Sequence, residues 1–128
     1  MKVLAVDYGS ARTGVAVSDP TGTLARPLGI VERAATEDGM RRLAEIVRVE
    51  EPERVVVGLP LTLRGERGLQ AEETERFVES LRREVEVPVE TFDERFTTTL
   101  AGPGGDDDAR AAAHLLTSYL EWWKNRQA

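Results

Sequence analysis

The sequence contains no cysteine and only one histidine, His114. Disulfide bonds, thiolate zinc sites and cysteine nucleophiles are therefore excluded, and so is any site that needs two or three imidazoles. Aromatic residues make up 5% of the chain, and no apolar run approaches the roughly 20 residues of a membrane span. Since the N-terminus also lacks the pattern of a signal peptide, we expect a cytoplasmic protein with no membrane attachment.

The residues that are present are those of an ordinary globular chain. Hydrophobic residues make up 41% of its 128 residues and charged residues 31%, which suffices for one domain, residues 1–128, with a substantial core. The formal net charge of −6 argues against broad, sequence-independent binding of nucleic acid through surface charge. It leaves open a local basic patch, or an acidic site that reaches phosphate groups through metal ions.

Short apolar runs alternate with segments of helical periodicity. Two valine-rich runs separated by a short loop predict a β-hairpin at the N-terminus, and a third run that contains Pro27 is typical of an edge strand. A hairpin meander followed by right-handed β-α-β crossovers gives an α/β fold, a mixed five-stranded sheet flanked by helices in the ribonuclease H-like arrangement. We expect strands at residues 2–8, 13–19, 23–31, 54–60 and 88–95, and helices at about 36–51, 69–85 and 107–123.

Acidic residues cluster at positions that such a fold brings together. Asp7 ends the first strand, Asp93 and Glu94 end the fifth, and the run Asp106–Asp108 opens the last helix. In open sheets of this kind, ligands lie at the carboxyl ends of the parallel strands. Carboxylates held close together repel one another unless a cation neutralises them, and Mg²⁺ or Mn²⁺ suits a site of oxygen ligands. Two such ions about 4 Å apart can activate water and stabilise the leaving oxygen of a phosphodiester without a histidine base.

Several of these acids also have a purely structural interpretation. Aspartate and glycine are common in hairpin turns, so Asp7 could simply begin a turn, and Asp19 has the pattern of a turn residue. The run at 106–108 is typical of a helix N-cap that also complements the helix dipole. We favour the capping role for its first two residues and a metal-binding role for Asp108.

The adjacent acids at the end of the fifth strand are expected to differ in role. Neighbours in a strand point to opposite faces, so only one of Asp93 and Glu94 faces the metal ions unless the strand has already ended. We assign Glu94 as the ligand, and we expect Asp93 to bind Arg95 or a backbone amide.

Several segments of the chain resemble the bacterial YqgF/RuvX family. The resemblance is carried in order by residues 7–19, 25–28, 55–61 and 92–98, and by the last helix from Asp108, and it covers nearly the whole chain. It implies a RuvC-like variant of the ribonuclease H fold and a role in maturing the 5′ end of the 16S rRNA precursor. Some members of the family are also described as Holliday-junction resolvases.

The resemblance also implies a set of site residues and partners. The metal-binding acids of the family correspond to Asp7, Asp93, Glu94 and Asp108, of which Asp7, Glu94 and Asp108 are the expected catalytic residues. The implied cofactor is Mg²⁺ or Mn²⁺. The implied partner is an rRNA precursor or branched DNA, with association with the ribosome, for a protein that is a monomer or a homodimer.

One departure from the family concerns the stretch before the last helix. Members usually carry a longer, basic segment there, whereas residues 99–107 are short, acidic and rich in glycine. Contacts to the nucleic-acid backbone must then come from elsewhere. The expected candidates are Arg12, Arg64, Arg67 and Arg95, together with Thr97 and Thr98 of the family motif.

Three classes of function remain compatible with the sequence. The leading one is a metal-dependent endonuclease that acts on structured RNA or branched DNA. The second is an actin-like ATPase or phosphotransferase, whose phosphate loop also has Asp-x-Gly before a hairpin; that class clamps ATP between two such domains, and 128 residues supply one. The third is a non-catalytic nucleic-acid-binding or ribosome-assembly factor, which the acidic composition and the shortened segment favour. The sequence does not choose RNA over DNA.

Overall fold

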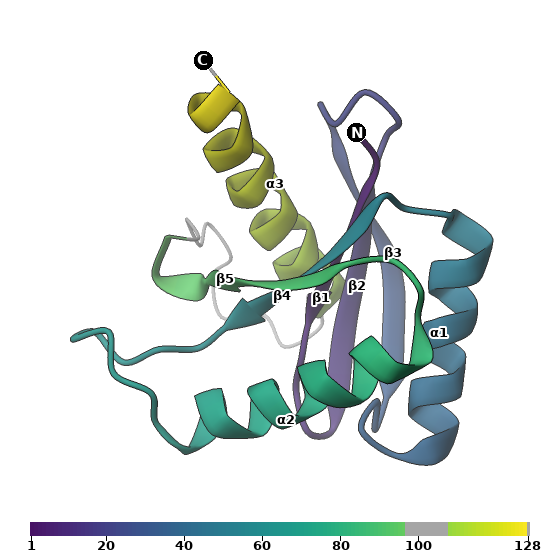
Figure 1. The fold of residues 1–128 in the computed structure, drawn as a ribbon, viewed down its shortest axis with the longest axis vertical. Helices are drawn as coiled ribbons and strands as arrows, with labels where there is room; N and C mark the ends of the chain where they lie inside the picture. Colours follow the sequence, from purple (N-terminus) through teal and green to yellow (C-terminus); the bar gives the residue numbers. More distant parts are fainter. Residues whose placement is uncertain (97–107, 128) are drawn as a thin grey trace.

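A five-stranded mixed sheet forms the centre of the structure, which is a computed structural model that describes residues 1–96 and 108–127 (Figure 1). The strand order is β3-β2-β1-β4-β5; β1, β2 and β3 pair antiparallel, whereas β4 and β5 run parallel to β1. The strands are β1 (Val3–Asp7), β2 (Arg12–Ser18), β3 (Ala25–Glu32), β4 (Arg54–Leu59) and β5 (Val89–Asp93). Both parallel crossovers contain a helix, as parallel strands require.

The central strands are apolar because both of their faces are covered. Residues 3–6 of β1 and 55–57 of β4 have no exposed surface, which explains their continuous valine-rich runs. The edge strand β3 instead accommodates Pro27, and its pairing with β2 shifts by one residue between Val15 and Ala16.

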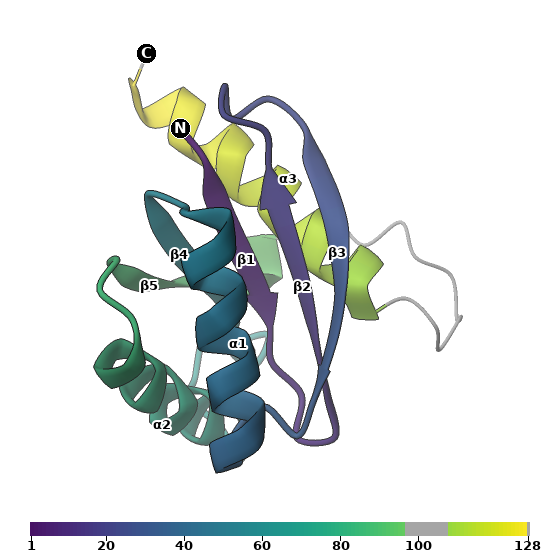
Figure 2. The same ribbon diagram turned by 90° about the vertical axis from the view of Figure 1, so that its right-hand side faces the viewer.

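Helices cover the two faces of the sheet in separate groups (Figure 2). Helices α1 (Glu37–Glu50) and α2 (Leu69–Glu84) pack on one face, and α3 (Asp108–Gln127) packs on the other. The Thr36 hydroxyl accepts the Gly39 amide at 3.1 Å, which caps the start of α1 as expected. None of the described helices combines the length and the apolar character that crossing a membrane demands.

The predicted fold class is confirmed, and most element boundaries lie within two residues of expectation. The fifth strand ends at Asp93, and residues Glu94–Phe96 form a short 3₁₀ turn, η1, in place of a longer strand. The last helix continues beyond residue 123 to Gln127, because its final turn carries Lys124 and Arg126, which favour a helix C-terminus. Because β1, β4 and β5 run parallel, their carboxyl ends lie at the same end of the sheet, where Leu59 pairs with Asp93.

Candidate active site

Asp7 and Glu94 form a pair of carboxyl groups at the carboxyl ends of the parallel strands. Asp7 is the last residue of β1, and Glu94 is the first residue of η1, directly after β5. Burial, the charge of Asp7, a side-chain hydrogen bond with Asp7 and the smaller effect of Asp93 together raise the pKa of Glu94 to about 7. The raised pKa therefore reflects a carboxyl group that is both buried and close to a second acid.

Gly58 makes room for Glu94 at the end of β4. A Cβ atom at this position would lie 2.5 Å from Oε1 and 2.8 Å from Cγ of Glu94. The absence of a side chain at Gly58 therefore lets the Glu94 carboxyl lie against the strand that separates β1 from β5. The sequence indicates only that a glycine ends this strand, and the approach of Glu94 becomes visible once β4 and β5 are paired.

Asp93 has a different partner from Glu94. Its Oδ1 accepts the backbone amide of Arg95 at 2.9 Å, and its Oδ2 accepts the guanidinium Nε at 3.0 Å and NH2 at 2.6 Å. These side-chain hydrogen bonds hold the pKa of Asp93 below its ordinary value. Binding of Asp93 to both Arg95 and a backbone amide is thus confirmed, and Asp93 at the end of β5 and Glu94 at the start of η1 have different partners.

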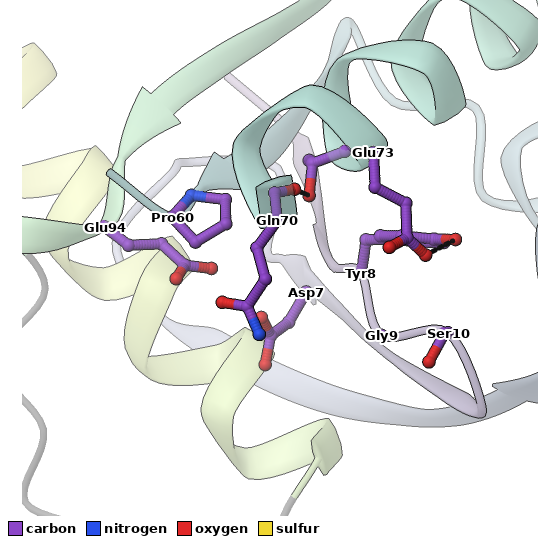
Figure 3. A pocket seen from close by; sticks show the side chains of 9 residues that line it. Asp7, Tyr8, Gly9, Ser10, Pro60, Gln70, Glu73 and Glu94 are labelled. Carbon is purple, nitrogen blue, oxygen red and sulfur yellow. Dashed lines mark hydrogen bonds between the residues drawn. The ribbon is translucent and has the colours of Figure 1, made fainter. Parts of the chain in front are cut away.

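A polar cleft of about 170 Å³ extends from this acid pair toward α2 (Figure 3). Gln70 extends from the first turns of α2 into the cleft, and Glu73 lies farther along beside Tyr8. The Tyr8 ring stacks on Phe77 with ring centroids 4.3 Å apart, and its hydroxyl donates to Oε1 of Glu73 at 3.2 Å. The residues that line the cleft are Asp7, Tyr8, Gly9, Ser10, Pro60, Gln70, Glu73, Thr74 and Glu94.

The α2 wall of the cleft is the part of the site that the sequence predictions omit. The sequence does indicate which side of α2 faces the sheet, because the buried stripe that includes Phe77 and Leu81 begins earlier in the helix and includes Thr74. Gln70, four residues earlier, then lines the same cleft as Asp7 at the end of β1. This juxtaposition depends on tertiary packing and has no motif of its own.

The remaining predicted acids lie at the edge of the described structure or beyond it. Asp108 is the first residue of α3, but its side chain lies outside the described part of the chain, as do Asp106 and Asp107 and the motif residues Thr97 and Thr98. Within the described residues, no group of three or more acids or histidines forms a complete metal site. A metal-binding role for Asp108 therefore stays a prediction.

Three of the four predicted arginines lie in or against the loop between β4 and α2, because Arg64 and Arg67 belong to it and Arg95 NH1 donates to the Leu63 carbonyl at 3.4 Å. Arg67 pairs with Glu75 of α2, and Arg95 pairs with Asp93. Arg12 begins β2 at the same end of the sheet as Asp7, and Arg64 is exposed in the loop after β4. Contact of these residues with nucleic acid stays a prediction.

The strand order, the helices on both faces and the acid pair at the carboxyl ends of the parallel strands define a protein of the ribonuclease H-like class. Residues 1–122 match the family model described as "RuvX: Holliday junction resolvase", and the chain belongs to this family. The resemblance noted in the sequence is thereby confirmed.

Relatives in the family share a substantial part of this sequence. A protein of Chloroflexus aurantiacus named "Putative pre-16S rRNA nuclease" is 44% identical over 99 residues, which cover 77% of this chain and 65% of that protein. A protein of Nocardia farcinica with the same name is 48% identical over 137 residues, covering 92% of this chain and 76% of that protein. Because this alignment is longer than the 128-residue chain, the Nocardia protein contains residues that this chain lacks.

Solved structures show the same fold at low sequence identity. RuvC of Thermus thermophilus in complex with a Holliday junction has a TM-score of 0.62 at 19% identity, and the match covers 97% of this chain and 96% of that one. The fowlpox virus resolvase with its Holliday junction substrate has a TM-score of 0.57 at 15% identity, covering 96% and 99%.

Proposed function

We propose that the protein is a metal-dependent endonuclease that hydrolyses phosphodiester bonds in structured RNA, most specifically at the 5′ end of the 16S rRNA precursor. The observation that carries the proposal is the Asp7–Glu94 pair, which lies where the strands of a ribonuclease H-like sheet end. The names of the relatives support the ribosomal substrate.

The chemistry of the acid pair fits a hard divalent cation. Both side chains offer only oxygen ligands, and a cation would offset both causes of the raised pKa of Glu94, its burial and the nearby charge of Asp7. Asp7, Glu94 and Asp108 would hold the metal, which we propose to be two Mg²⁺ or Mn²⁺ ions. When bound, they supply an activated water and stabilise the leaving oxygen.

The neighbouring residues of the chain prepare the pair for this task. The ion pair of Asp93 with Arg95 fixes the turn that presents Glu94, and Gly58 leaves space for the Glu94 carboxyl. Above the pKa of about 7, Glu94 gives up its proton and both carboxylates become available as ligands. The cleft toward α2 then receives the sugar-phosphate chain beside the bond that is cut.

A second candidate substrate is branched DNA, because the matching family model is described as a Holliday junction resolvase. The other two classes of function are less well supported. The cleft of about 170 Å³ is smaller than the roughly 300–1,000 Å³ typical of pockets that enclose a small-molecule ligand, which disfavours an enclosed ATP. A non-catalytic factor would leave the acid pair without a use.

The decisive experiment compares cleavage of a 16S precursor RNA and a four-way DNA junction under the same conditions. We expect Mn²⁺-dependent cleavage of the RNA at a defined position, abolished by a chelator and restored by added Mn²⁺. Preferential cleavage of the junction would favour the resolvase. Binding of either substrate without cleavage in any metal would identify a non-catalytic factor.

A further inference from the structure

The cleft beside the acid pair has two chemically different ends. At one end, Asp7 and Glu94 lie together at the carboxyl ends of the strands; at the other, Tyr8 and Glu73 face each other across the start of α2 (Figure 3). Both ends line one cleft, so a phosphodiester held at the acid pair would direct its neighbouring sugar toward the second end.

The α2 end of the cleft demands a hydrogen-bond donor. Tyr8 donates to Oε1 of Glu73 at 3.2 Å and thereby orients the carboxylate, which is partly buried. A carboxylate has about four acceptor positions, so one donor from Tyr8 leaves acceptor capacity toward the cleft.

The shape of this end suits a sugar better than a base. The Tyr8 ring lies against Phe77 at an interplanar angle of 19°, so the face toward Phe77 is not available to stack on a nucleobase. The cleft volume of about 170 Å³ also leaves little space for a base together with its sugar and phosphate.

Only one sugar group inside a nucleic-acid strand can donate a hydrogen bond. The 3′ and 5′ oxygens of an internal nucleotide are esterified, which leaves the 2′-hydroxyl, and DNA does not have it. A carboxylate acceptor that meets the sugar therefore distinguishes the two polymers.

We propose that Glu73, oriented by Tyr8, accepts a hydrogen bond from the 2′-hydroxyl of a nucleotide flanking the cleaved phosphodiester, and that this contact selects RNA. The inference rests on the proposed nuclease function and adds the determinant of its substrate class. A hydrogen bond to a charged acceptor typically changes a rate or affinity by roughly 10- to 100-fold.

The test uses an RNA substrate with a mapped cleavage site. Single 2′-deoxy and 2′-fluoro substitutions are placed on either side of that site, since fluorine is small but cannot donate. With Mn²⁺, we expect the wild-type kcat/KM to fall roughly 10- to 100-fold for both substitutions at one of the two flanking nucleotides. Glu73→Leu should cut all substrates at a similar, reduced rate, because its two acceptors are gone.

Two further variants make the comparison specific. Glu73→Gln keeps one acceptor oxygen and should retain part of the difference in kcat/KM between unmodified and 2′-substituted RNA. This variant tests the Glu73 contact even if Glu73→Leu fails to fold. Glu72→Leu is the matched control, because Glu72 is the exposed neighbour on the same helix and does not line the cleft. The ratio of its kcat/KM values on unmodified and 2′-substituted RNA should equal that of the wild type.

The outcomes separate this inference from the nuclease proposal. Equal wild-type rates on ribo- and 2′-substituted RNA would overturn the Glu73 contact and leave a metal-dependent nuclease. Full discrimination in a folded Glu73→Leu or Glu73→Gln would assign the hydroxyl to another group and also overturn it. Absence of Mn²⁺-dependent cleavage of every substrate would overturn both proposals together.

Discussion

At the scale of single residues, glycine positions show how closely the active site depends on backbone approach. Gly9 is required because a Cβ atom would lie 2.4 Å from the carbonyl oxygen of Arg12 across the β1–β2 turn. The glycine after Asp7 is therefore explained by the closure of the hairpin and needs no bound phosphate. Gly58, in contrast, is explained by the side chain of Glu94.

Gly58→Ala should therefore damage the acid pair more than the fold. The added methyl group would displace Glu94 from its place beside Asp7, so we expect a large loss of Mn²⁺ affinity and of cleavage. Calorimetric titration with Mn²⁺ and melting curves measure the two effects. Gly68→Ala is the control for metal affinity, because its Cβ would meet the nearest atom at 3.9 Å and should leave that affinity unchanged, although the loss of the N-cap glycine of α2 should lower the melting temperature. Wild-type metal affinity in Gly58→Ala would contradict the packing argument.

The titration of Glu94 predicts how stability changes with pH in the absence of metal. The folded protein holds the Glu94 proton up to a pKa of about 7, against an ordinary value of 4.5 in the unfolded chain. The folded state thus binds more protons at Glu94 between these values, so the contribution of Glu94 to stability is fully present below about pH 4.5 and is lost as the pH rises through 7. The loss is at most about 3 kcal/mol, lowered by the solvent that reaches the group.

Glu94→Gln removes this titration. We would measure the free energy of unfolding by chemical denaturation between pH 5 and 8 in the presence of a chelator. This free energy should change less with pH in Glu94→Gln than in the wild type. Identical slopes in the two proteins would mean that Glu94 is not the group that titrates.

Asp7→Asn should abolish cleavage and leave the fold intact. The change is nearly isosteric, removes one charged ligand and removes the repulsion that raises the pKa of Glu94. We expect the metal-free variant to melt at the same temperature as the wild type or higher, with cleavage reduced by orders of magnitude. Wild-type cleavage by Asp7→Asn would place the active site elsewhere.

At the scale of secondary-structure elements, the first turn of α3 is where capping and catalysis have to be distinguished. Acids at a helix N-terminus stabilise the helix in any case, and neighbouring acids can substitute for one another as caps. A metal ligand has one geometry and no substitute. The helix begins at Asp108, so this residue is at the position where both roles are available.

The comparison of Asp108→Asn with Asp107→Asn separates these roles. We expect Asp108→Asn to lose orders of magnitude in Mn²⁺-dependent rate with little change in melting temperature. Asp107→Asn should cost at most about 1 kcal/mol of stability and leave the rate nearly intact. Small and equal effects on the rate would make Asp108 a cap.

At the scale of the whole molecule, the charge distribution bears on how an acidic protein holds nucleic acid. On α1, Arg41 pairs with Glu37 and Asp38, and Arg48 pairs with Glu45, and neither arginine lines the cleft beside the acid pair. Arg12 is exposed at the active-site end of the sheet, and this position makes it the candidate for a phosphate contact.

Arg12→Ala should weaken RNA binding similarly for all sequences. Each lost phosphate contact lowers the slope of log K against log salt concentration by about one, and somewhat less for single strands. Binding titrations at several salt concentrations measure this slope, and Arg41→Ala on α1 is the control that should not change it. An unchanged slope in Arg12→Ala would remove this residue from the interface.

Most of the fold follows from local patterns in the sequence, whereas parts of the site do not. The positions of β1, β4 and α2 were predictable because their apolar patterns reflect burial directly. The position of β3 was predictable because its proline is compatible with an edge strand. The separate partners of Asp93 and Glu94 depend on the turn η1, which has no strong sequence signal. The cleft wall formed by Tyr8 and Glu73 joins residues far apart in the chain. Such a contact is set by packing and cannot be seen in a single segment.

The sheet order also has a consequence for the order of assembly. The meander of β1, β2 and β3 uses neighbouring segments, whereas the parallel pairs β1–β4 and β4–β5 must wait for two helical crossovers. Asp7 belongs to the early part and Glu94 to the latest strand connection. A growing or partly folded chain therefore carries one half of the acid pair and would not yet hold the proposed cation. Metal binding then acts on the finished sheet alone, so rising Mn²⁺ concentration should slow global unfolding without speeding the formation of the N-terminal meander.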